Sequence, residues 1–467
     1  MDLILGNDLK KIDLILDEVK IRMVQFLEKL DTLPTHAQDQ SIPTFPLPNT
    51  GLGSLGSLEL FQEHFQKLIV GSAGPRYWGF VTGGTTPASI VGDWLTTVFD
   101  QNTQSLKGSG DISAEIELET IKLLLELLNL PPEFNGGFVT GATMSNFTGL
   151  AVARQWAGAQ LGKDIARDGM TGDVVVLGGS AHSSVIKCLS MLGFGSSNLL
   201  NIRTITNREA IDVTALEETL NGLSGKSVIL NCSAGTVNTV DFDDIQAIVK
   251  LREKHKFWLH IDAAFGGFAT CANAYRHLLT GWEHADSITI DCHKWLNVPY
   301  DSAVILTRKE HKHLQIQCFQ NSNAAYLGDS NDRFSYLNFL PENSRRFRAL
   351  PVWFSLMAYG KAGFRSIVEN SIHCAQTFGN LIEASGEFEL MAPVRLNVVC
   401  FGLKGNKEST ADFLYKLNAR GSVFMTPTVL YGKQCIRAAF VNFRTSPQDI
   451  EIAMTELNQV YSQMFQN

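Results

Sequence analysis

The fold is decided by the stretch Asp-Ser-Ile-Thr-Ile-Asp-Cys-His-Lys-Trp-Leu-Asn-Val-Pro-Tyr, which occupies residues 286–300. Its first part, residues 287–291, predicts a short buried strand, and this strand ends just before Lys294. A second apolar run, residues 258–262, predicts another strand that ends at Asp262. The sequence therefore places a lysine and an aspartate at the carboxyl ends of two strands that follow each other along the chain.

A lysine and a carboxylate in this arrangement are the two groups that a pyridoxal phosphate site needs most. The lysine amine forms a Schiff base with the aldehyde, and the carboxylate keeps the pyridine nitrogen protonated so that the ring accepts electrons. Taken alone, the His-Lys-Trp motif is better explained by a lysine in a solvated loop, where most lysines lie. The cofactor interpretation depends on Asp262 and on two further segments of the chain.

Length and composition describe an ordinary globular chain. At 467 residues we expect two or three lobes, since a single core does not grow to this size. Hydrophobic residues at 45% and charged residues at 18% leave enough apolar surface to bury. The net charge of −8, with no dense basic run, argues against nucleic acid as a partner.

Other classes are disfavoured by what the sequence does not contain. No apolar run approaches the ~20 residues that a membrane span needs, so no membrane partner is expected. Residues 1–8 lack the basic start and long apolar stretch of a signal peptide. The eight cysteines are spread singly, without a Cys-x-x-Cys pair. We therefore expect no metal site, no disulfide framework and a cytoplasmic location.

The first 70 residues are predicted to form a helical arm and a linker. Apolar residues recur at helical spacing over residues 9–30, and the helix is expected to end before Pro34. Residues 41–57, with three prolines and three glycines, predict the linker. The apolar stripe of the arm packs either on its own chain or across a dimer interface.

Residues 71–340 are predicted to form a large α/β domain, and residues 341–467 a smaller C-terminal α+β domain. In the large domain helices alternate with short apolar strands, which indicates a mostly parallel sheet covered by helices on both faces. The predicted strands are residues 137–140, 174–177, 228–231, 258–262, 287–291 and 303–306. Ligands of such sheets sit outside the carboxyl ends of the strands. A polar loop is expected over residues 317–343.

Two further segments follow strands of this predicted sheet. Residues 141–146, Gly-Ala-Thr-Met-Ser-Asn, open a helix, where free backbone amides suit a phosphate; an ordinary helix cap explains the isolated motif equally well. His182 also stands at a helix start, where a histidine either caps the helix or lies on a cofactor ring and transfers protons. Because both segments share one sheet edge with Asp262 and Lys294, we interpret all four as one site.

With these motifs, the chain resembles the group II pyridoxal-phosphate-dependent amino acid decarboxylases, such as the aromatic-L-amino-acid, histidine, glutamate and diaminobutyrate enzymes. The resemblance extends from Pro75 to Arg437. It implies the pyridoxal-phosphate-dependent transferase fold type I (aspartate-aminotransferase-like), a seven-stranded sheet, and a homodimer with active sites at the interface. The motifs that carry it are residues 181–185, 260–264, 285–287, 293–295 and 344–348, and residues 275–281 look like the aromatic branch.

The resemblance also implies roles for single residues around the cofactor. Lys294 matches the Schiff-base lysine, Asp262 the partner of the pyridine nitrogen, and His182 the imidazole stacked on the ring. Ala264 matches the small residue on the other face of the ring, and His293 is expected to contact the cofactor.

The phosphate is expected at the turn that opens the helix after residue 141. Ala142, Thr143 and Met144 fall on this turn, and the family commonly has a hydroxyl where Met144 stands. Only a backbone amide is then available at that position, so the missing contact is expected to come from Ser145 or Thr236.

Three residues are assigned to the substrate. Thr82 matches a substrate-side hydroxyl, and Arg437 matches an arginine that binds substrate carboxylate in the glutamate enzymes, although an ordinary salt bridge explains it too. Glutamate enzymes have a polar side chain where Phe80 stands, so glutamate is disfavoured. Phe80, Trp78 and Phe99 either line an aromatic pocket or belong to the core.

Two features of the site remain open at this stage. Tyr326 matches a loop tyrosine that returns a proton to the α-carbon, and the alternative is a surface tyrosine. Asp291 and Cys292 stand where relatives often have Asn and Pro. An extra carboxylate at Asp291 disfavours an anionic phosphate unless it is paired or points away.

The predicted reaction is the decarboxylation of an L-amino acid to its amine and carbon dioxide. An aromatic amino acid is the first choice of substrate, followed by diaminobutyrate or another small polar amino acid. The alternatives are an aldehyde synthase or an aminotransferase on the same fold and, more remotely, a cofactor-binding protein without catalysis.

Overall fold

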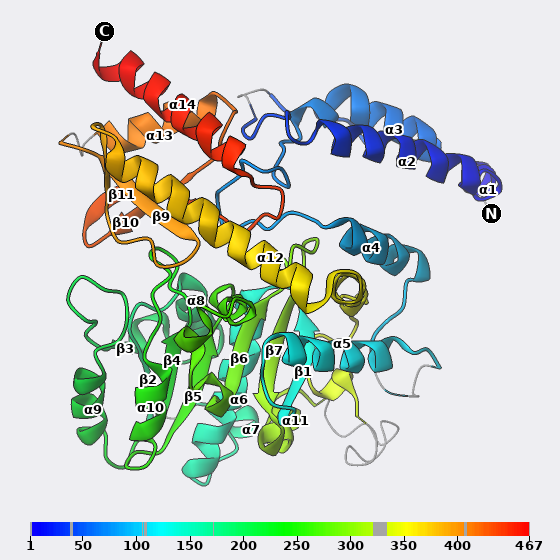
Figure 1. The fold of residues 1–467 in the computed structure, drawn as a ribbon. Helices are drawn as coiled ribbons and strands as arrows, with labels where there is room; N and C mark the ends of the chain where they lie inside the picture. Colours follow the sequence, from blue (N-terminus) through cyan, green and yellow to red (C-terminus); the bar gives the residue numbers. More distant parts are fainter. Residues whose placement is uncertain are drawn as a thin grey trace.

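The computed structural model describes residues 2–37, 41–104, 106, 110–170, 172–320, 334–405 and 409–466. Figure 1 shows three parts: a helical arm at the amino terminus, a large sheet covered by helices, and a small sheet with its own helices near the carboxyl terminus. Helix α12 (Ala349–Ala384) runs between the two sheets. None of the helices in the described part of the chain is both long and apolar enough to cross a membrane.

The large sheet has seven strands in the order β1-β7-β6-β5-β4-β2-β3. Strand β7 runs antiparallel to both of its neighbours, and the other pairs are parallel. The mostly parallel seven-stranded sheet predicted from the sequence is thereby confirmed. The strands are β1 (Phe134–Val139), β2 (Val174–Gly178), β3 (Leu199–Asn201), β4 (Ser227–Ser233), β5 (Phe257–Asp262), β6 (Ser287–Asp291) and β7 (Ala303–Arg308).

Helices cover both faces of this sheet, and each face has its own apolar cluster. Alternate residues of a strand point to opposite faces, so Leu259 and Ile261 of β5 join the cluster that includes α5, α9, α10 and α12. Trp258 points the other way, into the cluster of α6, α8 and α11. The helices that cover the two faces together with α12 are α5 (Ser113–Leu127), α6 (Ala142–Gln160), α8 (Ser183–Met191), α9 (Val213–Asn221), α10 (Ile245–Leu251) and α11 (Lys312–Phe319).

The small sheet has four antiparallel strands in the order β10-β11-β9-β8. It packs with α13 and α14 into a separate core of aromatic and aliphatic side chains. The elements are β8 (Phe388–Leu390), β9 (Val398–Leu403), β10 (Thr426–Leu430), β11 (Lys433–Ala439), α13 (Thr410–Ala419) and α14 (Pro447–Phe465). A smaller C-terminal sheet domain is therefore present, while the boundaries at residues 70 and 340 stay predictions.

The arm consists of α1 (Leu3–Lys10), α2 (Ile12–Lys29) and α3 (Gly53–His64). The helix predicted over residues 9–30 is thus two helices that meet at Lys11, and α3 begins inside the expected linker. The polar loop expected from residue 317 also begins later, because α11 continues to Phe319.

A buried ion pair fixes the edge of the large sheet at β1. The Arg345 guanidinium lies 2.6 Å from a Glu117 carboxylate oxygen, and both side chains are fully buried. Glu117 accepts the N–H of Phe138, and Arg345 donates to the Phe138 carbonyl. The pair therefore satisfies backbone groups of a strand that has no neighbour on that side. Burial raises the pKa of Glu117, and Arg345 opposes that shift.

Arg345→Met is expected to lower the free energy of unfolding by about 3–5 kcal/mol, because it leaves the Glu117 carboxylate buried without its cation. Urea unfolding followed by tryptophan fluorescence measures the change. The double variant Arg345→Met/Glu117→Leu removes both charges and should recover much of the loss. A double variant less stable than the single one would contradict this account.

Candidate active site

The carboxyl ends of the parallel strands bring the predicted residues together. Asp262 is the last residue of β5 and Asp291 the last of β6, while α6 begins directly after β1 and α8 after β2. A cavity of about 150 Å³ opens at this edge. Eight of the predicted residues line it: Phe80, Ala142, His182, Thr236, Asp262, Ala264, Lys294 and Arg437. Thr82, Thr143, Met144 and His293 do not line it, and Tyr326 lies outside the described residues.

Several cavity residues were missed by the sequence analysis. Most of them are next to a predicted residue in the sequence, so the sequence predicted these segments but not every residue of them that lines the cavity. Ser233 is not next to a predicted residue. It is the last residue of β4, and this position at a strand end is the signal that could have identified it. The missed residues are Val81, Ser180, Ser233, Gly235, Val237 and Phe265.

Asp262 is held by two hydrogen bonds. Its Oδ2 accepts from Asn146 Nδ2 at 2.9 Å, and its Oδ1 accepts from the Ala264 N–H at 3.2 Å. The carboxylate is buried and faces the same cavity as Lys294. It therefore presents a fixed negative charge to any cationic ring nitrogen placed in the cavity.

His182 caps α8 and also lines the cavity, so the cap is confirmed and its place on a cofactor ring stays a prediction. Its Nδ1 accepts from the Ser184 N–H at 3.2 Å and lies 2.8 Å from Ser184 Oγ. Burial lowers the pKa of His182, and Asp262 only partly opposes this shift. The imidazole is therefore neutral, and because Nδ1 accepts, the network assigns the proton to Nε2.

Lys294 forms an ion pair with Asp291, whose Oδ2 lies 2.8 Å from the amine. Asp291 is almost fully buried, and its Oδ1 lies 3.5 Å from His293 Nε2, beyond a good hydrogen bond. The extra carboxylate is thus paired rather than turned away.

Gly83 packs against the segment that carries Lys294, and a Cβ at Gly83 would lie only 1.7 Å from the Lys294 carbonyl oxygen. Only glycine permits so close an approach.

The turn that opens α6 offers backbone amides rather than side chains. Met144 packs into an apolar cluster with Val139 and Phe339, as its apolar side chain favours. The Ser145 hydroxyl is engaged with Thr289 Oγ1 at 2.9 Å and the Val304 carbonyl at 3.0 Å. The expectation that Ser145 supplies the missing contact is therefore wrong, because no hydroxyl proton is left for a phosphate.

Two neighbouring groups complete the surroundings of this turn. His293 accepts the Ser302 N–H at Nδ1, and its Cε1 would lie 3.4 Å from a Cβ at Gly141. It therefore stands beside the start of α6, and burial lowers its pKa. The Thr236 hydroxyl, which lines the same cavity, donates to a Glu209 carboxylate oxygen at 2.6 Å, so like that of Ser145 it has no proton left for a phosphate.

The substrate side of the cavity combines one cation with apolar side chains. Arg437 donates to the Val237 carbonyl at 3.2 Å, its Nε has no partner, and burial lowers its pKa. Phe80 stands at the mouth, 61% exposed, and both it and Val81 have positive φ angles, which is uncommon for bulky residues and is typical of binding sites. Thr82 is buried, with its hydroxyl 3.5 Å from the Tyr300 hydroxyl.

The other two aromatic residues do not join Phe80 at the cavity. Trp78 is fully buried in the core of the C-terminal sheet, because the segment before the first large-domain helix crosses over to it. Phe99 is half exposed at the end of helix α4 (Pro87–Phe99). Trp78 therefore belongs to the core, and Phe99 lies neither in the cavity nor in the core.

Pyridoxal phosphate fits these residues. One cavity holds a lysine amine, a buried carboxylate, a neutral histidine and the small Ala264 side chain. The start of α6 adds backbone amides for the phosphate, and the Nε of Arg437 is buried without a partner. Lys294, Asp262, His182 and the amides of residues 142–144 would hold the group, which would supply an electron sink for the carbon–carboxylate bond.

Comparison with known proteins shows the family. A family profile described as the pyridoxal-dependent decarboxylase conserved domain matches residues 60–404. The aromatic-L-amino-acid decarboxylase of Bacillus atrophaeus is 30% identical over 425 residues, covering 87% of this chain and 85% of that protein. The L-2,4-diaminobutyrate decarboxylase of Acinetobacter baumannii is 27% identical, covering 80% and 76%. This chain belongs to the pyridoxal-dependent decarboxylases, which are carboxy-lyases, and its cofactor is pyridoxal phosphate.

Solved structures agree on the fold. The tryptophan decarboxylase of Catharanthus roseus, in complex with L-tryptophan, superposes with a TM-score of 0.87 at 21% identity, and the match covers 98% of this chain and 99% of that one. The expected fold type is confirmed by this match and by the sheet order.

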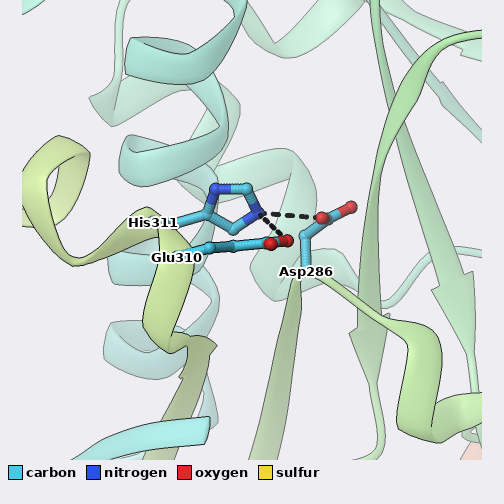
Figure 2. A group of neighbouring side chains, drawn as sticks. All are labelled: Asp286, Glu310 and His311. Atoms are coloured by element: carbon cyan, nitrogen blue, oxygen red, sulfur yellow. Dashed lines mark hydrogen bonds and ion pairs between the residues drawn. The ribbon is translucent and has the colours of Figure 1, made fainter. Parts of the chain in front are cut away.

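A second group of polar side chains lies at the other end of β6. Figure 2 shows the His311 ring with its Nε2 toward both Asp286 and Glu310, and this nitrogen lies 2.9 Å from Asp286 Oδ1 and 3.6 Å from Glu310 Oε1. Asp286 also accepts from Arg252 and from the Leu259 N–H, so its charge is already neutralised. These bonds tie β5 to β6, and the guanidinium opposes a metal cation.

Asp291→Asn is expected to bind pyridoxal phosphate about tenfold more tightly at neutral pH, or ~1.4 kcal/mol. To react with an aldehyde, the Lys294 amine would have to leave its 2.8 Å ion pair with Asp291, and the negative charge of Asp291 also disfavours a phosphate. Absorbance titration of the unloaded protein with the cofactor measures the affinity.

The matched control for this titration is Asp301→Asn, which changes a partly exposed aspartate bonded to Arg348. It should bind the cofactor as the unaltered protein does. Unchanged or weaker binding by Asp291→Asn would show that the ion pair does not oppose cofactor capture.

Proposed function

We propose that this enzyme decarboxylates an L-amino acid to its amine, with an aromatic amino acid as the preferred substrate. The observation that carries the proposal is the single cavity shared by Lys294, Asp262 and His182. A structural lysine would not need a buried carboxylate and a neutral histidine on the same cavity wall.

The fixed charges of the chain suit this reaction. Asp262, held by Asn146 and the Ala264 amide, would keep a proton on the pyridine nitrogen, because a buried carboxylate stabilises a neighbouring cation. His182 would present its Nε2–H to the cavity, where it can hold or move a proton. Ala264 would leave room for the ring on the opposite side.

Binding of the substrate would involve Arg437 and Phe80. Among the described residues, Arg437 is the one guanidinium that lines the cavity, and none of them bonds its Nε, which would be free for a carboxylate. Phe80, Val81 and Val237 give the cavity apolar contacts. An aromatic side chain matches them, whereas a second ammonium group, as in diaminobutyrate, would face the charge of Arg437.

We assign the return of a proton to the α-carbon to Tyr326, on the basis of the family pattern. Tyr326 lies outside the described residues, so this role rests on the sequence and on the chemistry of a phenol as a proton donor.

An end-point screen of the loaded protein against the common L-amino acids and diaminobutyrate tests the proposed function. Carbon dioxide, amine, aldehyde and keto acid are measured together. Carbon dioxide with an equal amount of amine from an aromatic substrate is expected. Aldehyde in place of amine would favour the aldehyde synthase, and keto acid without carbon dioxide would favour the aminotransferase.

We further propose a homodimer in which the amino-terminal arm forms part of the interface. No residue of α1 or α2 is buried in the single chain. Eight of their large apolar side chains are 47–82% exposed, which is more than one isolated chain is expected to leave in water. These side chains are Leu3, Leu5, Leu9, Ile12, Leu14, Leu16, Ile21 and Val24.

The double variant Leu9→Glu/Leu16→Glu is expected to be a monomer. Each leucine buried at an interface contributes about 1.5–3 kcal/mol, and a charge in its place must be desolvated. Light scattering should give roughly twice 51.5 kDa for the unaltered protein and about 51.5 kDa for the variant. Lys20→Glu, which changes charge on the same arm without removing apolar surface, should stay a dimer. A monomeric unaltered protein would contradict the proposal.

A further inference from the structure

One buried amide links the two residues that face the cofactor position, Asp262 directly and His182 through Ser184. Asn146 lies in the second turn of α6 and is fully buried. Its Nδ2 donates to Asp262 Oδ2 at 2.9 Å and to Ser184 Oγ at 3.1 Å. Ser184 Oγ in turn lies 2.8 Å from His182 Nδ1. The carboxylate and the imidazole are thus joined through a single side chain.

The oxygen of the same amide is also fully used. Asn146 Oδ1 accepts from His260 Nε2 at 2.9 Å and from Thr289 Oγ1 at 2.6 Å. An amide offers two donors and two acceptor positions, so all four are occupied. This side chain therefore has one orientation, and no other arrangement keeps its partners satisfied.

The chain of hydrogen bonds continues through the sheet to an indole. Trp258 Nε1 donates to Ser287 Oγ at 3.0 Å, and Ser287 Oγ lies 2.7 Å from His260 Nδ1. Burial lowers the pKa of His260 to about 4, so the ring is neutral and carries one proton. All of these groups are buried, which makes an unsatisfied donor or acceptor costly.

The Asp262 end sets the direction of this chain. The Asp262 carboxylate can only accept, so Asn146 must turn its NH₂ group toward it and its oxygen toward His260. The proton of the neutral His260 ring therefore lies on Nε2, and His260 Nδ1 accepts from Ser287, whose oxygen accepts the Trp258 N–H. The second N–H of Asn146 then reaches Ser184, whose own proton goes to His182 Nδ1.

We propose that Asn146 is a positioning residue that fixes Asp262 and, through Ser184, holds His182 with its proton on Nε2, facing the cavity. The run Trp258–Ser287–His260 continues these bonds inside the sheet and keeps the oxygen of Asn146 paired. This inference rests on the proposed function for its meaning, since Asp262 and His182 are the residues assigned to the cofactor, but its geometry stands without it.

The first test is the affinity of the protein for pyridoxal phosphate. Asn146→Asp keeps the size of the side chain but replaces the donor by an oxygen that faces Asp262. Affinity is expected to fall about tenfold to a hundredfold, as measured by absorbance titration. Asn397→Asp makes the same change at a fully buried asparagine of the C-terminal domain and should leave the affinity within twofold.

The second test reads the histidine directly and needs no bound cofactor. Nitrogen-15 NMR of the histidine-labelled protein distinguishes a proton on Nε2 from one on Nδ1. His182 is expected to be protonated on Nε2 in the unaltered protein, and Asn146→Asp, whose new oxygen would take the Ser184 proton, should mix its two forms. Trp258→Phe leaves the bonds of Asn146 to Asp262 and His260 in place and should leave His182 unchanged.

The outcomes separate the inference from the proposed function. If Asn146→Asp binds the cofactor as tightly as the unaltered protein and His182 keeps its Nε2 proton, the inference is overturned while the decarboxylase proposal stands. If the unaltered protein binds no cofactor, the proposed function fails, and the NMR comparison still decides whether Asn146 controls His182.

Discussion

The alternation of side chains along β5 is the constraint on which the rest of the site depends. Trp258, His260 and Asp262 point to the face covered by α6, and Leu259 and Ile261 point to the opposite cluster. The face of β5 that places Asp262 at the cavity therefore also buries the His260 imidazole and the Trp258 indole. Because buried polar groups need partners, the Asn146 amide in the second turn of α6 bonds both Asp262 and His260.

The sequence predicts the fold and the centre of the site because both are carried by local patterns. Strands β5 and β6 agree with their predicted bounds within one residue, and Lys294, Asp262 and His182 each follow a recognisable strand. The short strand β3 was missed, since three residues give no period. The roles of Asn146 and Ser184 could not be predicted, because Asn146 meets Asp262 across 116 positions and Ser184 across 38.

Two buried ion pairs show how structural and functional charges differ in this protein. Arg345 and Glu117 share their hydrogen bonds with the backbone of an edge strand, so their charges stabilise the sheet. Asp291 has one bonded oxygen and one without a hydrogen bond among the described residues, and its partner Lys294 would have to leave it to hold the cofactor as proposed. An incompletely satisfied pair beside a cavity is typical of a group that changes partners during function.

The cavity also depends on the contact between the two sheets, because Arg437 belongs to β11 of the small one. Its NH1 donates to the Val237 carbonyl in the large domain. Glu209 holds that turn in place, since it accepts from Thr236, Asn238 and Thr239. The cation that would bind substrate is therefore placed by a buried carboxylate that never touches the cavity's reactive groups. If Arg437 binds the substrate as proposed, substrate choice would depend on how the two sheets are joined as well as on the residues that line the cavity.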